Sequence, residues 1–437
     1  MAFRLGISQM SFLELCKTAE RRKDIMIDRF KLSPSELERF RCGPLGPHLD
    51  LFAHLLSEQG YSSQVGLQKI RLVTFLSRWL EQNHIEVEKL HEQRIADFLK
   101  ARRKPLRRHR QVRHTLAQFL EHLRRSKIIP DQRPPQLENS TDRLMHGYAR
   151  FLAEERGLSP VTLANYLPIA RRFISNVFGT EAVHLRELAA SDVHASILRD
   201  RSTLSPKRVQ LTTSVLRSFL GFLYLRGQLA APLAASVPTV ATWRLSDLPQ
   251  YLEPDQVQRL LQSCERNSPC GQRDYAALLL LARLGLRAGE VVHLCLEDIN
   301  WNTGDVLIRG KSSREDRLPL PPDIGRALAT YLKKGRPRCS SRRVFIRMKA
   351  PHSGFSSSVA VCDIVRRALL RAELHPEHKG AHLLRHSLAT KMLRGGASLT
   401  QIGQILRHQL PQTTEIYAKV DLAALRAVAQ PWPGGVR

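Results

Sequence analysis

The sequence has few of the patterns that mark metal-binding, membrane or secreted proteins. Its seven cysteines are dispersed, with no C-x-x-C pair and no histidine pair at zinc-finger spacing, so a structural zinc site is not expected. No apolar run approaches the roughly 20 residues needed to cross a bilayer, and the first residues lack a signal-peptide core. We therefore expect a cytoplasmic protein with reduced thiols, no cofactor and no membrane partner.

Acidic residues are also scarce. Against 68 Lys and Arg there are only 40 Asp and Glu, which gives a formal charge of +28 and a pI near 10.5. Such an excess favours a polyanionic partner, because each phosphate that is neutralised releases condensed counterions. An acidic membrane surface would attract the same charge, but nucleic acid is the leading candidate.

The chain of 437 residues is too long for one ordinary core, and its first half contains an internal repeat. Residues 52–130 and 148–232 align at a shift of about 100 residues. Each contains an amphipathic helix, a Gly turn, a Ser cap and a second helix with apolar residues three and four apart. The proline-containing segments 131–142 and 232–250 read as linkers. Two small helical bundles are predicted.

Positive charge gathers in both repeats. The stretch KARRKPLRRHRQVRH, residues 100–114, has eight Lys or Arg in fifteen positions and no acid. A run of this kind is usually a solvated helix face, but an uncompensated block repels itself unless an anion approaches. In the second repeat, an Arg pair and the helix start SPKRVQ offer similar groups. The candidate DNA-binding residues are Arg102, Arg103, Lys104, Arg107, Arg108, Arg171, Arg172, Lys207 and Arg208.

From about residue 251 the pattern becomes mixed α and β. The turn signal NTGD at 302–305 precedes a β-branched run, and GKSSREDRLPL at 310–320 reads as the turn and the return strand. Helical patterns lie on both sides of this hairpin. The sequence therefore predicts a mainly helical domain with a small antiparallel sheet at one edge.

Five stretches of this last part carry the residue types that attack on a phosphodiester requires. They are LGLRAGEV, the GK of the hairpin with RLPL following, H-x-x-R-H, LRHQL, and a tyrosine nine residues after the last histidine. A phosphodiester is anionic, so cations must lie where charge accumulates in the transition state. The candidate catalytic residues are Arg287, Lys311, His382, Arg385, His408 and Tyr417.

The order and spacing of these residues resemble the tyrosine recombinase family, which includes phage integrases and Xer-type enzymes, across roughly residues 140–425. The resemblance implies a DNA-breaking and rejoining enzyme that acts through a 3′-phosphotyrosyl intermediate on specific sites in double-stranded DNA. It departs from the family at Arg407, where glycine is usual, and after Lys311, where many relatives carry glycine. A homo- or hetero-tetramer on paired sites, a nucleoid location and a mobile-element origin are further expectations.

The resemblance also implies a role for each residue. Tyr417 is the nucleophile, which needs its proton removed because its ordinary pKa is about 10, and His382 is the candidate base. Arg287 and Arg385 present guanidinium forks to the phosphate. Lys311 supplies the proton of the leaving 5′ oxygen, and His408 hydrogen-bonds the phosphate.

Neighbouring residues have supporting roles. Glu290 and Asp298 resemble acids that orient the arginines, and His386 is interpreted as structural, bonding a neighbouring helix. The expected organisation is an N-terminal helical extension at 1–45, a possible extra core-binding-like DNA-binding unit at 46–131, a core-binding, SAM-like helical domain at 140–235 and a catalytic domain at 250–437.

Two other functions stay open. A type IB topoisomerase-like enzyme would cut and reseal one strand without exchange, and a noncatalytic DNA-binding regulator would have kept only the fold. The complete set of candidate catalytic residues argues against the regulator.

Overall fold

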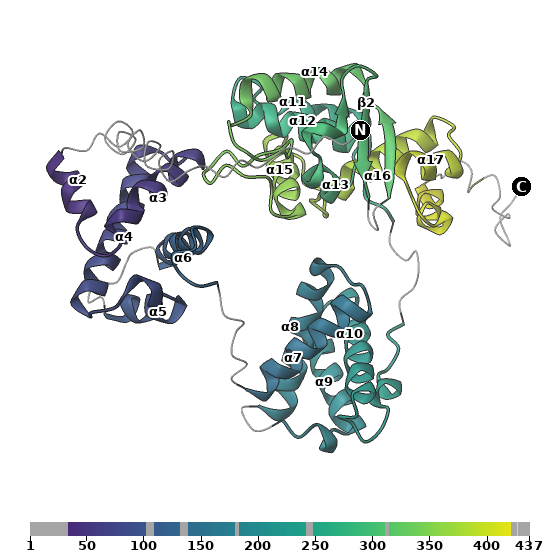
Figure 1. The fold of residues 1–437 in the computed structure, drawn as a ribbon. Coiled ribbons are helices and arrows are strands. Elements are labelled where there is room, and N and C mark those ends of the chain that lie inside the picture. Colours follow the sequence, from purple (N-terminus) through teal and green to yellow (C-terminus); the bar gives the residue numbers. More distant parts are fainter. Residues whose placement is uncertain are drawn as a thin grey trace, which may run out of the picture. The chain divides into compact units, whose positions relative to one another are not determined.

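A computed structural model describes residues 34–101, 109–131, 139–179, 183–241, 248–310, 314–420 and 426. The chain divides into two compact units, one formed by Met1–Asp131 together with Asp247–Arg437 and the other by Gln132–Ser246. The predicted fold class is confirmed: two helical bundles precede a mainly helical domain with one small antiparallel sheet (Figure 1). Within the described ranges, no helix is both long and apolar enough to cross a bilayer.

The first bundle is built around an aromatic and aliphatic core. Phe52 and Phe119 meet edge to face with ring centroids 5.0 Å apart, and both are fully buried. Burial of such residues is the main stabilising term of a small bundle. The helices are α2 (Pro34–Arg41), α3 (Gly46–Glu58), α4 (Ser63–Gln82), α5 (Glu92–Ala101) and α6 (His109–Arg125).

The second bundle also has a core built around packed aromatic residues. Its core is centred on Tyr148 and Phe219, whose ring centroids are 4.9 Å apart. Its helices are α7 (Ser140–Arg150), α8 (Pro160–Phe178), α9 (Ala190–Thr203) and α10 (Pro206–Leu225).

The internal repeat is visible at the same local structures in both bundles. Gly60 and Gly157 adopt φ angles of +78° and +60°, a left-handed region that glycine enters at little cost. Two residues later, Ser62 and Ser159 accept hydrogen bonds from the first turns of α4 and α8. The predicted order of Gly turn, Ser cap and long helix is therefore confirmed in both bundles.

The C-terminal domain is organised around α12, whose residues 276–282 are buried on every side. A helix that is apolar all round must lie inside the domain. The helices are α11 (Pro254–Gln262), α12 (Pro269–Arg283), α13 (Ala288–His293), α14 (Pro322–Thr330), α15 (Ser358–Arg371), α16 (Ala381–Arg394), α17 (Leu399–Leu406) and the short 3₁₀-helix η9 (Glu415–Val420).

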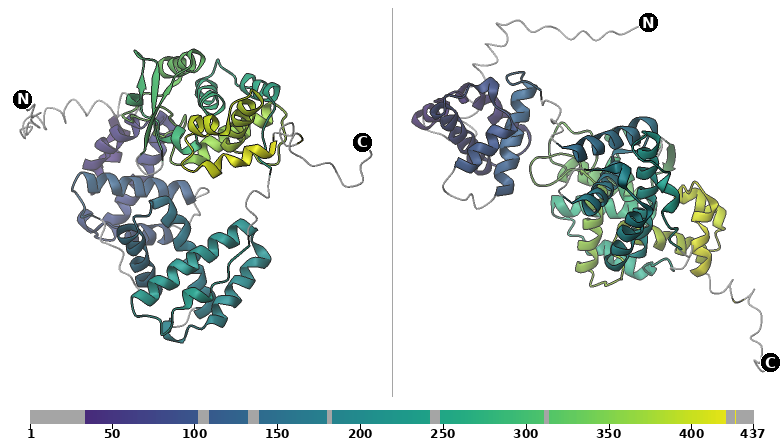
Figure 2. Two further views of the ribbon diagram at one scale, coloured as in Figure 1. Left: turned by 90° about the vertical axis from the view of Figure 1, so that its right-hand side faces the viewer. Right: turned by 90° about the horizontal axis from the view of Figure 1, so that it is seen from below.

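The predicted hairpin forms at one edge of this domain, as the left view of Figure 2 shows. Strands β1 (Ile299–Asn300), β2 (Asp305–Arg309) and β3 (Glu315–Pro319) pair antiparallel in that order. Val306 and Ile308 of β2 point into the core, since both are almost completely buried. Lys311 falls between β2 and β3 but lies outside the described residues.

Candidate active site

Arg385 is held between two segments that are far from it in the sequence. It lies on α16, and only 3% of its surface is exposed. Its guanidinium donates hydrogen bonds to the carbonyl oxygens of Gly285 and Leu406. Burial, together with the charges of Arg287 and Arg407, lowers the pKa of Arg385 to about 10. The group therefore remains protonated at neutral pH.

Gly285 makes this close approach possible. Its φ of +58° is in the left-handed region, and a Cβ atom placed there would lie 2.7 Å from Cδ2 of Leu406 and 3.0 Å from Cδ2 of Leu388. Both distances are shorter than ordinary van der Waals contact. The glycine of the LGLR motif is thus required by the contact of this loop with α16 and α17.

Arg287 immediately precedes α13 and is oriented by Glu290. Its backbone N–H donates to Oε2 of Glu290 at 2.8 Å, and its Nη1 donates to Oε1 at 2.8 Å. Its Nη2 donates to the carbonyl oxygen of Arg407 at 3.2 Å. The side chain is only half-buried, so the guanidinium keeps donors available for an incoming anion.

Arg407 occupies the position where glycine was expected. Its φ of 56° and ψ of 49° are left-handed, a conformation that costs a non-glycine residue about 1–2 kcal/mol. Its buried guanidinium donates to Oε2 of Glu290 at 2.9 Å and to the carbonyl oxygen of Ile405 at 3.0 Å. The ion pair with a buried carboxylate offsets the backbone cost and leaves the carbonyl directed at Arg287.

Glu290 is therefore shared between two arginines. Burial opposes ionisation of this carboxyl, but the charge of Arg407 and the hydrogen bonds and charge of Arg287 outweigh it, so the pKa of Glu290 is lowered. A charged Glu290 can hold both guanidinium groups in fixed positions.

Tyr417 lies on η9 and is 1% exposed, packed with Leu406 and Ile402. Its hydroxyl lies 2.9 Å from Nδ1 of His386. Burial raises the pKa of Tyr417 to about 12, although the charges of Arg385 and Arg287 lower it in part. Without DNA, the phenol is therefore protonated and covered.

Three histidines share the positive surroundings of the arginines. Burial, then the charges of His382 and Arg385, lowers the pKa of His386 to about 4. Burial, and then the charges of Arg385 and Arg287, lowers the pKa of His408 to about 4. His382 is more exposed, and partial burial with the charges of Arg385 and Arg287 also lowers its pKa. At neutral pH, His386 is uncharged, so its Nδ1 can accept the proton of the Tyr417 hydroxyl.

Comparisons with known proteins identify the family of this chain. The phage integrase family model matches residues 250–423. A Sinorhizobium fredii protein described as "Putative integrase/recombinase y4rA" is 42% identical over 396 residues, which are 90% of this chain and 95% of that protein. The chain belongs to the phage integrase family of tyrosine recombinases. It is a tyrosine-type site-specific recombinase.

Further relatives are consistent with this assignment. Tyrosine recombinase XerC of Salmonella typhi is 31% identical over 294 residues, covering 64% of this chain and 92% of that protein. Among solved structures, a lambda integrase (75-356) dimer bound to a COC' core site aligns with a TM-score of 0.50 and 18% identity, over 63% of this chain and 94% of that chain. The structural likeness shows a shared fold.

The structure of the recombinase brings together five of the six candidate catalytic residues. The pKa of Arg385 is affected by the charges of Arg287 and Tyr417. The pKa values of His408 and Tyr417 are both affected by the charges of Arg385 and Arg287. His382 is influenced by both arginines. His408 is oriented by Thr414, whose Oγ1 lies 2.7 Å from Nδ1. The sixth, Lys311, falls outside the described residues.

The candidate DNA-binding residues of the second bundle lie on the surface. Arg171 and Arg172 are exposed on α8, and Arg171 pairs with Asp142 at 2.7 Å. Lys207 and Arg208 are exposed in the first turn of α10. The five candidates of the first bundle, at 102–108, lie outside the described residues.

One supporting role is corrected. Asp298 was expected to orient a catalytic arginine, but its Oδ1 accepts a hydrogen bond from Arg309 of β2 and its Oδ2 accepts from the backbone N–H of Cys295 at 2.8 Å. It therefore joins the turn before β1 to the hairpin. Glu290 does orient Arg287, as expected.

Two residues gained roles that the sequence did not assign. His386 contacts η9 as a structural histidine would, yet its partner there is the hydroxyl of Tyr417. Adjacent residues on a helix point in different directions and reach different neighbours. The signal for the contact with Tyr417 was therefore the position of His386 directly after Arg385. The sequence marks Arg407 only as a departure from glycine, since a left-handed arginine is recognisable only from the backbone.

Replacing Gly285 with alanine tests the packing around Arg385. The added Cβ would press on the side chains of Leu406 and Leu388 and strain the backbone at φ +58°. Because Leu406 also accepts a hydrogen bond from Arg385, we expect single-turnover DNA cleavage to slow on the order of 10–100-fold. Gly289→Ala is the matched control, because no atom lies within 4 Å of a Cβ there. Equal cleavage rates for the two variants would contradict the packing argument.

Acid stability tests the neutral histidines. The pKa values of His386 and His408 are about 4 in the folded chain, against an ordinary 6.5. Between these values the unfolded chain binds more protons, so the free energy of unfolding must fall as the pH drops from about 6.5 to about 4. We expect the double variant His386→Gln, His408→Gln to lose less in Tm than the unsubstituted protein between pH 7 and pH 5.

Other histidines with lowered pKa values, such as His122 and His293, will keep part of this acid sensitivity in both proteins. The informative quantity is therefore the difference between the two Tm shifts, measured by calorimetry. An identical shift in both proteins would show that His386 and His408 do not stay neutral in the folded state.

Proposed function

We propose that the recombinase cuts and rejoins duplex DNA at specific sites through Tyr417. The observation that carries the proposal is the convergence of the Tyr417 hydroxyl, a neutral imidazole and two arginines at the C-terminal end of α17. Relatives named as tyrosine recombinases, and a solved relative bound to a core site, support DNA as the substrate.

In the proposed cleavage step, the phenol oxygen of Tyr417 bonds to the phosphorus while the bond from phosphorus to the 5′ oxygen breaks. The Tyr417 proton moves to Nδ1 of His386, which lies 2.9 Å from the hydroxyl. This assignment replaces His382 as the base and leaves His382 as a group near the phosphate. Lys311 gives a proton to the leaving 5′ oxygen. Rejoining reverses these transfers with the 5′ hydroxyl of another strand.

Positive charge makes this step possible. Arg287 and Arg385 neutralise the nonbridging oxygens as charge builds there, and His408 donates a further hydrogen bond. The same charges favour the phenolate of Tyr417, against the effect of burial. Because the phenol is 1% exposed, the segment of η9 must shift before a phosphate can reach it, so the DNA-free form is a protected resting state.

The remaining parts of the proposal concern assembly and setting. We propose that 140–235 is a core-binding domain, that Arg171, Arg172, Lys207 and Arg208 contact DNA phosphates, and that the working form is a tetramer on two paired sites. The exposure of these four side chains supports the second point. A cytoplasmic, nucleoid-associated location and a mobile element as the source agree with the relatives described as integrases.

Tyr417→Phe tests the nucleophile. On a nicked suicide duplex we expect the unsubstituted protein to be trapped as an adduct on the 3′ phosphate, and the variant to give no adduct while still binding DNA. Tyr331→Phe is the matched control. Tyr331 is also fully buried in this domain, and its hydroxyl accepts from the backbone N–H of Ile346 at 3.1 Å, so its loss should leave the adduct intact.

The same assay separates the alternatives. DNA binding with no adduct from the unsubstituted protein would indicate a regulator. An adduct accompanied by relaxation of any supercoiled plasmid, with no exchange between two sites, would indicate a topoisomerase-like activity. Exchange between two copies of one site, lost in Tyr417→Phe, is the result that we expect.

A further inference from the structure

Helix α4 of the first bundle presents an unusual exposed stripe. Apart from Ser63, Val65 and Glu81 near its two ends, the exposed residues of α4 recur at every third or fourth position. At about 100° per residue, these six lie within roughly 40° of one line. None of them is acidic. In order, they are Gln64, Gln68, Arg71, Phe75, Arg78 and Gln82.

The opposite face of α4 fixes this stripe in place. Ile70, Val73, Leu76 and Leu80 are completely buried in the core of the bundle. The helix is 20 residues long and its first turn is capped by Ser62, so it is a rigid rod of about 30 Å. The stripe therefore has little freedom to rotate away from solvent.

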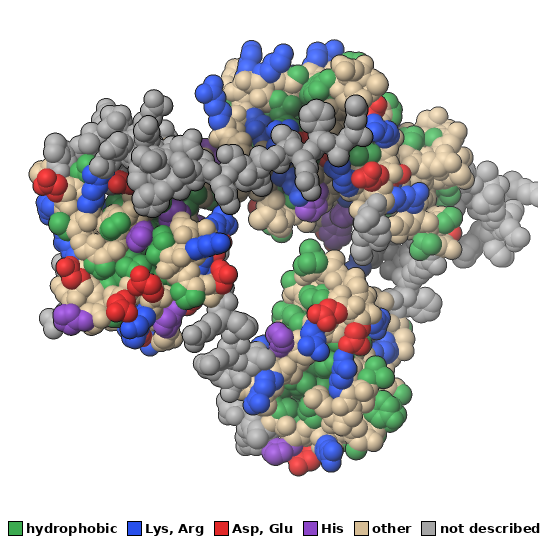
Figure 3. Space-filling model, in the orientation of Figure 1, with side chains coloured by type: hydrophobic (Ala, Val, Ile, Leu, Met, Phe, Trp, Pro, Cys, Tyr) green, Lys and Arg blue, Asp and Glu red, His purple; other side chains and the backbone are tan. Residues whose placement is uncertain are grey.

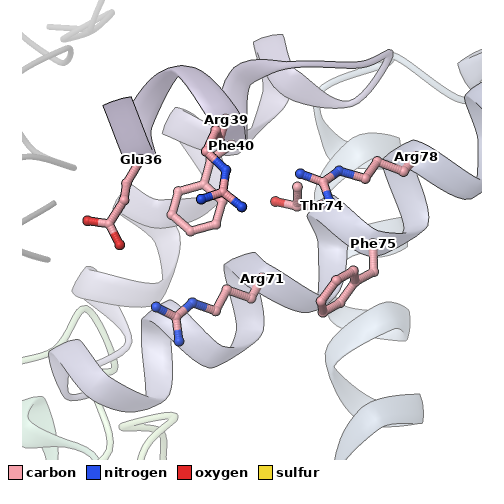
Figure 4. Close-up of a pocket in the computed structure, with 7 residues that line it drawn as sticks. All are labelled: Glu36, Arg39, Phe40, Arg71, Thr74, Phe75 and Arg78. Atoms are coloured by element: carbon pink, nitrogen blue, oxygen red, sulfur yellow. The ribbon is translucent and has the colours of Figure 1, made fainter. Parts of the chain in front are cut away.

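A pocket of about 240 Å³ lies beside the stripe, between α4 and α2. Figure 4 shows Arg39 of α2 on one side of it, with Arg71 and Arg78 of α4 on the other. Phe75, which is 47% exposed, lies between the two α4 arginines in sequence. The carboxylate among the described lining residues is that of Glu36.

The three arginines have no carboxylate within ion-pair distance anywhere in the described ranges, although many arginines of this protein do. Figure 3 shows acidic side chains beside basic ones at several places on the visible surface, whereas the six residues of the stripe include no acid. Exposed guanidinium groups that repel one another are stabilised by an anion.

We propose that α4 is a DNA-contacting helix, with Arg39, Arg71 and Arg78 binding phosphates or guanine edges of a duplex. The stripe has the right chemistry, because arginine reads guanine or phosphate, glutamine reads adenine, and an aromatic ring packs on a thymine methyl. An α-helix fits the major groove. The proposal rests on DNA being the substrate, and it assigns to the first bundle a contact separate from the site of Tyr417.

A solvated surface is the alternative for any exposed helix face, and it would tolerate acidic residues within the stripe. A docking site for a protein would favour a larger apolar area than one exposed phenylalanine. The combination of amide, guanidinium and aromatic groups without a carboxylate fits nucleic acid better than either.

The test uses the full chain and the double variant Arg71→Gln, Arg78→Gln. On a long duplex carrying the cleavage site, we expect about tenfold or greater loss of affinity and a fall of about 2 in the slope of log K against log salt. In a footprint, protection away from the cleavage site should disappear while protection around it stays.

The matched control removes two charges elsewhere in the same bundle. Arg94→Gln with Lys127→Gln changes exposed residues on α5 and after α6 by the same total charge, so it should keep both the distal footprint and most of the affinity. A third variant, Gln68→Ala, should relax sequence preference at one position with little change in the salt slope.

Several outcomes would overturn the proposal. If Arg71→Gln, Arg78→Gln behaves like the control pair, α4 does not contact DNA. If it changes self-association or partner binding with an unchanged footprint, the stripe is a protein-binding surface. Failure of the proposed function is distinguishable, because adduct formation by Tyr417 is read on a short suicide duplex that lacks the flanking DNA.

Discussion

Two adjacent carbonyl oxygens at the C-terminal end of α17 hold both candidate catalytic arginines, Arg385 and Arg287. Leu406 accepts from Arg385 and Arg407 accepts from Arg287. Carbonyls at a helix C-terminus have no partner within the helix and carry partial negative charge, so they suit guanidinium groups. Because the arginines come from α16 and from the loop before α13, this one helix end joins three separate parts of the sequence.

The electrostatics of the site follow from that arrangement. Glu290 is the carboxylate that pairs with Arg287 and Arg407. Burial, and then the neighbouring positive charges, lowers the pKa values of His386 and His408. The imidazoles are therefore neutral, which lets one of them accept the proton of Tyr417. In the proposed mechanism, an incoming phosphate supplies the negative charge that the site lacks, so binding of DNA and activation of Tyr417 would depend on the same cations.

Much of the fold could be predicted from local sequence signals. The Gly turns and Ser caps at Gly60, Ser62, Gly157 and Ser159 depend on nearby residues alone, and the hairpin at 302–320 depends on its turn. The candidate catalytic residues were found through spacing and resemblance. By contrast, the partners of His386 and Asp298 are 31 and 11 residues away, and choosing among such distant partners requires the packing of several helices. The left-handed backbone of Arg407 is also set by tertiary contacts, against the preference of the residue itself.

The most direct measurement compares single-turnover cleavage by Arg287→Ala on two duplexes, one with the ordinary phosphodiester and one with a methylphosphonate at the cleaved position. If the arginines act by neutralising charge on the nonbridging oxygens, the substitution should cost on the order of 10²–10³ in rate on the phosphodiester and far less on the uncharged analogue. An equal loss on both duplexes would contradict charge neutralisation and would indicate that Arg287 serves only to support the structure.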